Sequence, residues 1–236
     1  FFRTVEEDNE PVLTHQERFV DRVLDHTLEY GNVIYNVTNE GWAGIDWELH
    51  WAERILDRAR ERDVHVEVAN MNLEPEDSVR KAIEHPETFS YVEVSQHNQH
   101  FAGASGQDHW DNLREWRADV AEAIGPRPFN NVKIYGGFDG GNDAAEAAEA
   151  VEWFWRNVFA GCAACRFHRQ VAGGDEGWGI GGSDRALTHV RSVRMLEDHL
   201  DLWGLRPRQD LLEDVGPNEA YCLAAPGESY AVYVPA

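Results

Sequence analysis

Hydrophobic and polar positions along the chain follow two alternating periods. Apolar residues recur every three or four positions in six segments, which is the pattern of amphipathic helices. Shorter β-branched or apolar runs lie between these segments and predict strands. The predicted helices span 14–30, 46–62, 75–84, 108–124, 143–159 and 184–203, and the predicted strands span 32–38, 65–69, 89–94, 131–135 and 163–167.

Signals for helix ends support two of these predictions. Thr14-His-Gln-Glu17 is a capping box that predicts the start of the first helix. Gly31 and Gly204 follow the first and last helices, at positions where a left-handed residue often ends a helix.

The alternation of strands and helices limits the architecture. Strands joined by helices of this length run parallel, because each connection has to return along the sheet before the next strand starts. An open doubly wound sheet and a closed barrel both satisfy this condition. No strand is followed by a G-x-G-x-x-G or P-loop motif, so the nucleotide-binding form of the open sheet lacks its usual signature.

The pattern changes after Gly204. Two short strands, 219–225 and 229–234, are joined through Pro226-Gly227 and predict a β-hairpin. A hairpin of this size is marginal by itself. We therefore expect residues 1–205 to form the α/β domain and residues 206–236 to begin a β-sandwich-like domain.

Charge excludes two classes of partner. The chain has 43 acidic and 21 basic residues, for a formal net charge of −22. A nucleic-acid backbone or an anionic membrane would be repelled by such a surface. No run reaches the roughly 18 apolar residues that a membrane helix needs. The sequence does not indicate an oligomeric state or a location, and we expect any secretion signal to lie upstream of Phe1.

The cysteines leave two interpretations open. Cys162 and Cys165 form a C-x-x-C motif, and His168 and Cys222 are potential further ligands for zinc or partners in redox chemistry. The motif lies in an apolar run that is typical of a strand, where small thiols fill a core well. If the thiols only fill the core, we expect no metal and no organic cofactor.

Candidate site residues gather at the ends of the predicted strands, where parallel α/β folds form their ligand sites. Glu40 is the strongest candidate, because a carboxylic acid leaving a buried strand can stay protonated near neutral pH through desolvation. A solvated or helix-capping glutamate is the alternative. The candidate binding residues are Asn39, Trp42, Gln96, His97, Asn98, His100, Tyr135, His168 and Trp178.

These candidates have less specific alternatives. Trp42, Trp110 and Trp178 are suited to stacking on the apolar face of a sugar ring, but tryptophans on helices more often pack against a sheet. His97 and its neighbours are either ligands for hydroxyl groups or part of a polar loop. His168 is either a ligand or a core histidine.

The segment Val33 to Glu40 resembles the fourth strand of the clan A glycoside hydrolases, which ends in Asn-Glu. The chain is also similar to bacterial cellulase-like barrel proteins that carry a small C-terminal β-domain. The stretches that carry the likeness are 33–40, 94–99, 126–136, 154–168 and 218–233. The resemblance implies a partial (β/α)8 TIM barrel with strands four to eight, followed by the first hairpin of the β-domain. The first three barrel strands would lie outside this sequence.

The resemblance also implies a chemistry. Glu40 would be the acid/base in cleavage of the O-glycosidic bonds of a polysaccharide or oligosaccharide. Retaining enzymes need a second carboxylate about 5–5.5 Å away, and the strand that should supply it has no glutamate at its tip. Asp139 is the nearest acid and becomes the candidate nucleophile, unless it is an ordinary turn residue. The alternatives are a catalytically inactive carbohydrate-binding barrel protein and a metal or redox protein that uses Cys162, Cys165 and His168.

Overall fold

The computed structural model describes residues 3–7, 9–41, 43–98, 106–134, 147–168 and 184–235, without the side chains of positions 98, 147 and 148. This part of the chain has a mixed α/β fold. Its helices are α1 (Glu10–Thr27), α2 (Ile45–Arg60), α3 (Pro75–Glu84), α4 (Gly106–Ile124), α5 (Ala147–Phe159) and α6 (Asp184–Glu197), with short 3-10 helices η1 (Ser95–Asn98) and η2 (Gln209–Leu211). Its strands are β1 (Ile34–Gly41), β2 (Glu67–Asn72), β3 (Val92–Glu93), β4 (Phe129–Ile134), β5 (Ala164–Phe167), β6 (Arg206–Pro207), β7 (Tyr221–Ala225) and β8 (Ser229–Tyr233).

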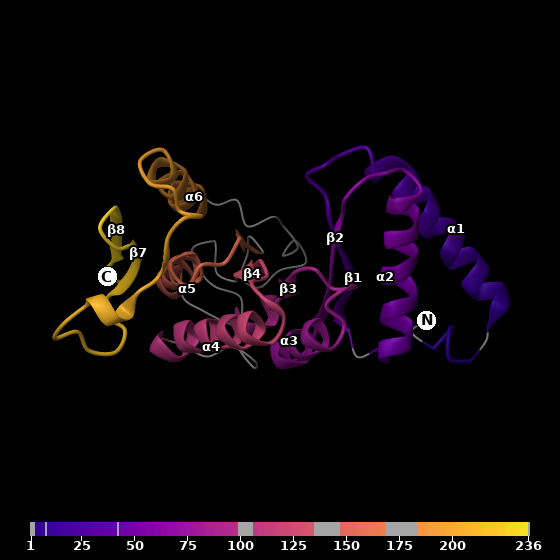
Figure 1. Ribbon diagram of the computed structural model, residues 1–236, viewed down its shortest axis with the longest axis horizontal. Helices are drawn as coiled ribbons and strands as arrows, with labels where there is room; N and C mark the ends of the chain where they lie inside the picture. The colour runs from indigo at the N-terminus through magenta and orange to yellow at the C-terminus, as the bar shows by residue number, and fades with distance from the viewer. Residues whose placement is uncertain are drawn as a thin grey trace.

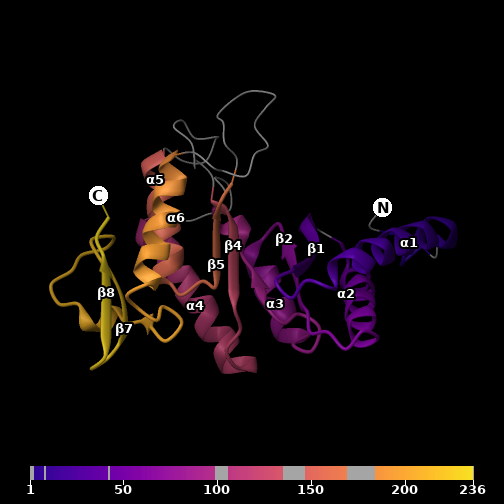
Figure 2. The same ribbon diagram turned by 90° about the horizontal axis from the view of Figure 1, so that it is seen from above.

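The elements are laid out along one long axis in chain order. Helices α1 and α2 lie at one end, and strands β7 and β8 lie at the other (Figure 1). Seen from above, α4, α5 and α6 separate the parallel strands from the C-terminal strands (Figure 2). None of the described helices is both long and apolar enough to cross a lipid bilayer.

The first five strands run parallel, as the alternating pattern predicts. β1 pairs with β2, and β3, β4 and β5 form a second sheet in that order. The Ser90 amide donates a hydrogen bond of 2.9 Å to the Val68 carbonyl, which joins β2 to the segment that leads into β3. Neighbours in the sheets are therefore neighbours in the sequence. Neither of these sheets closes on itself within the described residues.

Helices cover one face of these strands. Val68, Val92 and Val94 are buried in the main core together with residues of α2, α3 and α4. Because successive strand residues point to opposite faces, Glu67 and Glu93 belong to the other face. That face is partly open, and Ile34 of β1 is 48% exposed.

The C-terminal strands form a small antiparallel sheet in the order β6-β7-β8. The hairpin pattern predicted β7 and β8, and β6 is an additional strand. Tyr221 and Leu223 of β7 are buried in the same core as Phe159 of α5. The buried guanidinium of Arg156 on α5 donates hydrogen bonds to Asn218 Oδ1 at 2.7 Å and to the Tyr221 hydroxyl at 3.3 Å. The C-terminal strands thus pack on the α/β part through a common core.

Three helix ends that were predicted from sequence signals are wrong, and one of them is the end of α1, which lies at Thr27 and not at Tyr30. Helix α1 begins at Glu10 and has a proline in its first turn, which is a favourable start because proline lacks the amide that this turn leaves unpaired. The capping box at Thr14 therefore lies inside the helix. Helix α6 ends at Glu197 and not at Gly204. Leu200 and Leu202 both contact the core, which a continued helix would prevent because residues two apart do not share a face.

Candidate functional site

An ion pair joins the carboxyl ends of β1 and β4. The Lys133 Nζ atom lies 2.5 Å from Glu40 Oε1, although the two residues are 93 positions apart in the sequence. The Lys133 side chain is 8% exposed and the Glu40 side chain is 37% exposed. A nearly buried ammonium group therefore faces a carboxylate that solvent and small molecules can reach.

The backbone at Glu40 is held in an unfavourable conformation. Its φ is 54°, a left-handed value that costs a non-glycine residue about 1 kcal/mol or more. The register between β1 and β2 is irregular on both sides of Asn39. Strained residues of this kind cluster at ligand sites, where the surrounding structure keeps them in place. The backbone conformation is therefore a second reason, independent of the ion pair, to consider Glu40 a candidate site residue.

One expectation about Glu40 is wrong. The sequence predicted a desolvated acid at the end of a buried strand, but only two of the eight β1 residues are buried and the Glu40 side chain is 37% exposed. The physical reason is that β1 is an edge strand with β2 as its partner. An adjacent ammonium stabilises an ionised carboxylate. Glu40 is therefore held by an ion pair at a partly exposed position, and not in the apolar surroundings that the acid/base assignment expected.

Glu93 is a second carboxyl group near Lys133, and the sequence analysis missed it. It is 2% exposed and lies on β3, next to β4. It accepts hydrogen bonds from the Ser95 amide at 2.7 Å, from the Ser95 hydroxyl and from Asn130 Nδ2 at 2.5 Å. Burial raises the pKa of Glu93 to about 7, and these hydrogen bonds and the Lys133 charge oppose the rise. The one signal in the sequence is a glutamate inside the apolar run Tyr91-Val-Glu-Val94.

Two predicted ligands lie inside the core. Gln96 and His97 on η1 are 0% and 1% exposed. The His97 ring stacks on His109 with centroids 4.6 Å apart, and its Nε2 atom is 3.2 Å from the His109 carbonyl oxygen. Burial lowers the pKa of His97 to about 4, so the ring is neutral at physiological pH. In this arrangement neither side chain is open to a ligand.

The remaining described candidates lie at the same strand ends. Asn39 precedes Glu40 and is exposed. His168 follows β5, and its Nδ1 atom lies 2.9 Å from Nη2 of the exposed Arg166. Trp110 is fully buried against Tyr221, so the helix-packing alternative is correct for this tryptophan. The candidates that lie outside the described residues are Trp42, His100, Tyr135, Asp139 and Trp178, and the Asn98 side chain lies outside them too.

Comparison with known proteins gives this chain no family. No protein-family model, no curated protein and no solved structure matches it. The site therefore has to be interpreted from its own geometry.

The cysteine motif shows no metal-binding arrangement. The Cys162 thiol donates to Asn157 Oδ1 at 3.6 Å, and Cys162 and Cys165 are free thiols. Within the described segments, no three histidine, cysteine or acidic side chains are placed to hold one metal ion.

A polar network lies on the opposite face of β1 and β2, toward the helices. The Glu48 carboxylate of α2 is fully buried and accepts hydrogen bonds from Lys81 at 2.8 Å, Asn70 at 2.6 Å and Asn72 at 3.0 Å. Asn72 also donates to the Gly41 carbonyl at 3.2 Å. The network therefore fixes the end of β1 directly after Glu40.

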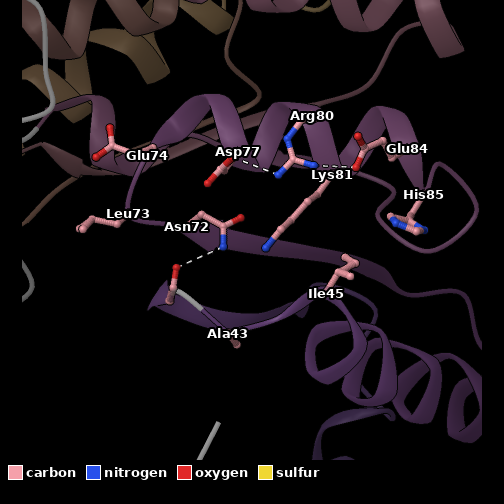
Figure 3. Close-up of a pocket in the computed structure, with 11 residues that line it drawn as sticks. Ala43, Ile45, Asn72, Leu73, Glu74, Asp77, Arg80, Lys81, Glu84 and His85 are labelled. Atoms are coloured by element: carbon pink, nitrogen blue, oxygen red, sulfur yellow. Dashed lines mark hydrogen bonds and ion pairs between the residues drawn. The ribbon is translucent and has the colours of Figure 1, made fainter. Parts of the chain in front are cut away.

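Beside this network is a pocket of about 510 Å³. Figure 3 shows Lys81 reaching from α3 toward Asn72, with Arg80 between Asp77 and Glu84 along the rim. Each cation that lines the pocket is already paired with a carboxylate. We therefore assign this region a structural role and take the Glu40 and Lys133 pair as the candidate site.

Proposed function

We propose that this chain binds carbohydrate at the carboxyl ends of its parallel strands, without hydrolysing it. The observation that carries the proposal is the ion pair between Glu40 and Lys133, at a strained residue on the strand edge where α/β folds place their ligands. A carboxylate and an ammonium side by side can accept and donate hydrogen bonds to neighbouring sugar hydroxyls. Glu40 lacks the apolar surroundings expected of a proton-donating acid, because its side chain is 37% exposed and paired with Lys133.

We propose that the strands that carry the site are part of a (β/α)8 barrel. Strands lie about 4.8 Å apart, so β1 and β4 would be about 14 Å apart in a flat sheet, and their side chains would stand roughly perpendicular to it. The contact between Glu40 and Lys133 is easier to explain if the sheet curls. The Tyr91 hydroxyl also lies 3.3 Å from the Tyr35 carbonyl oxygen of β1, across β2. Both contacts favour a concave inner face, as in a barrel.

A variant of Glu40 tests the binding proposal. Wild-type protein should bind at least one member of a panel of neutral oligosaccharides in isothermal titration calorimetry. Glu40→Gln should weaken that binding about 10-fold or more, because hydrogen bonds to a charged group are worth roughly 1.5–3 kcal/mol. Wild-type protein should not release the chromophore from aryl glycosides.

Glu67→Gln is the matched control. Glu67 lies on the same face of the sheet but is the first residue of β2, at the end opposite to the carboxyl end. Its side chain is 35% exposed, and that of Glu40 is 37% exposed. Its substitution should leave the affinity unchanged. Absence of binding to every oligosaccharide, or an equal loss in both variants, would exclude the site.

Glycoside hydrolysis is the second candidate, and the observation that favours it is the carboxyl group of Glu93. A site that holds one protonated and one ionised carboxyl group has the two roles that glycoside hydrolysis requires. Glu93 would then supply the proton and Glu40 would be the ionised partner, in place of the roles that the sequence suggested for Glu40 and Asp139. If wild-type protein cleaves aryl glycosides and both Glu93→Gln and Glu40→Gln abolish cleavage, this candidate replaces the first.

A further inference from the structure

A second pocket, of about 490 Å³, lies at the other end of the parallel strands. Its walls include residues 126–128, which precede β4, and residues 161–163, which precede β5. Residues of helix α6 and of the segment 202–206 also line it. Glu40 and Lys133 lie at the carboxyl ends of their strands, so this pocket is separate from the carbohydrate site.

The charge of this pocket is opposite to that of the chain. Four arginines and one carboxylate line it, in a sequence with 21 basic and 43 acidic residues. Arg194 pairs with the carboxylate of Glu197. The other three arginines are Arg117, Arg127 and Arg206, and in the part of the chain that the structure describes none of them forms an ion pair.

These three arginines donate to backbone carbonyl groups instead. Arg117 donates to Gly161, Arg127 donates to Pro86 at 3.4 Å, and Arg206 donates to Trp203 at 2.8 Å and to Leu205 at 2.9 Å. Carbonyl groups hold the guanidinium groups in position without forming an ion pair, and within the described residues only Arg127 of the three interacts electrostatically with a carboxylate, that of Glu67. Other arginines of this chain, such as Arg54 and Arg58, face two carboxylates or more.

Arg117 and Arg206 also affect each other. Burial lowers the pKa of the Arg117 guanidinium; Cys162 opposes this effect, and the charge of Arg206 adds to it. Two like charges in a partly desolvated pocket are unfavourable unless an anion lies between them. Planar guanidinium groups match the oxygens of a phosphate group particularly well.

The rest of the pocket is apolar. Its lining includes Phe154, Val158, Val193, Leu202, Trp203 and Leu205. Trp203 is 64% exposed, an unusual state for a tryptophan and one that leaves its ring open to a ligand. The volume is that of a site for a small molecule.

We propose that this pocket binds a small organic phosphate, with the phosphate on Arg117, Arg127 and Arg206 and an apolar body against Trp203 and Leu205. The proposal does not depend on the carbohydrate site. It requires both parts of the ligand, because the arginines recognise the anion and the apolar wall recognises the body.

Titration with phenyl phosphate tests this proposal. We expect saturable binding in calorimetry at low ionic strength, and much weaker binding of inorganic phosphate and of phenol, which each carry one half of the ligand. Arg206→Gln should weaken binding about 10-fold or more, because it removes a charge-assisted hydrogen bond. Arg206 is exposed, so this variant should fold, and circular dichroism checks that it does.

Arg208→Gln is the matched control, since Arg208 is two residues away and pairs with Asp210 at 2.6 Å. It should bind phenyl phosphate as wild-type protein does. Phenyl phosphate should also slow alkylation of Cys162, which lines the pocket. Equal binding of phenol and phenyl phosphate, equal binding of inorganic phosphate, or an equal loss in the two arginine variants would each overturn the proposal.

Discussion

Replacing Lys81 with methionine is expected to destabilise the protein by about 3–5 kcal/mol, because it leaves a buried carboxylate without its cation. Glu48 is 0% exposed and Lys81 is 7% exposed, and their charged groups are 2.8 Å apart. Asn70 and Asn72 still donate to Glu48 in the variant, but neutral amides do not compensate its charge. Urea unfolding followed by tryptophan fluorescence measures the loss.

Arg80→Met is the control, on the next residue of the same helix. Arg80 is 52% exposed and pairs with Asp77 at 3.1 Å and with Glu84 at 2.8 Å. Exposed pairs contribute little, so the loss should stay below about 1 kcal/mol. The double variant Glu48→Gln with Lys81→Met should recover most of the stability, because no charge then remains buried. Equal losses from Lys81→Met and Arg80→Met would contradict the burial of Glu48.

The order and direction of the elements could be predicted because they depend on local periodicity. The helix over 75–84 has the bounds that its pattern predicts, and the five parallel strands follow from the helices between them. Element ends were less predictable. Thr14 has a capping-box sequence, but the proline in the first turn moves the start of α1 to Glu10.

Contacts between distant residues could not be predicted from local patterns. Glu40 was recognisable from its place at a strand end, but its partner Lys133 is 93 positions away. Glu48 lies on a helix between Trp47 and Trp51, where a polar residue ordinarily faces solvent, and its cation lies 33 positions further on. A single sequence gives no sign of either pairing.

Glu93→Gln is expected to change how stability depends on pH. The pKa of Glu93 is raised from 4.5 to about 7, so its contribution to stability is fully present below pH 4.5 and is lost as pH rises through 7. Ionising the buried group costs about 3 kcal/mol at pH 8, at about 1.4 kcal/mol for each pKa unit. Glutamine keeps the shape without the charge. The stability of the variant relative to wild type should therefore increase by up to about 3 kcal/mol between pH 4.5 and pH 8.

The free energy of unfolding has to be compared between the variant and wild type at each pH, because His97 changes the stability of both proteins in the opposite direction. Burial lowers its pKa from 6.5 to about 4, so its contribution is present above pH 6.5 and is lost as pH falls through 4. Glu53→Gln makes the same change at an exposed position of α2 and should leave the pH dependence as in wild type. If Glu93→Gln behaves like Glu53→Gln, Glu93 is not a buried acid. Hydrolysis would then lack its proton donor, and carbohydrate binding alone would remain for this strand edge.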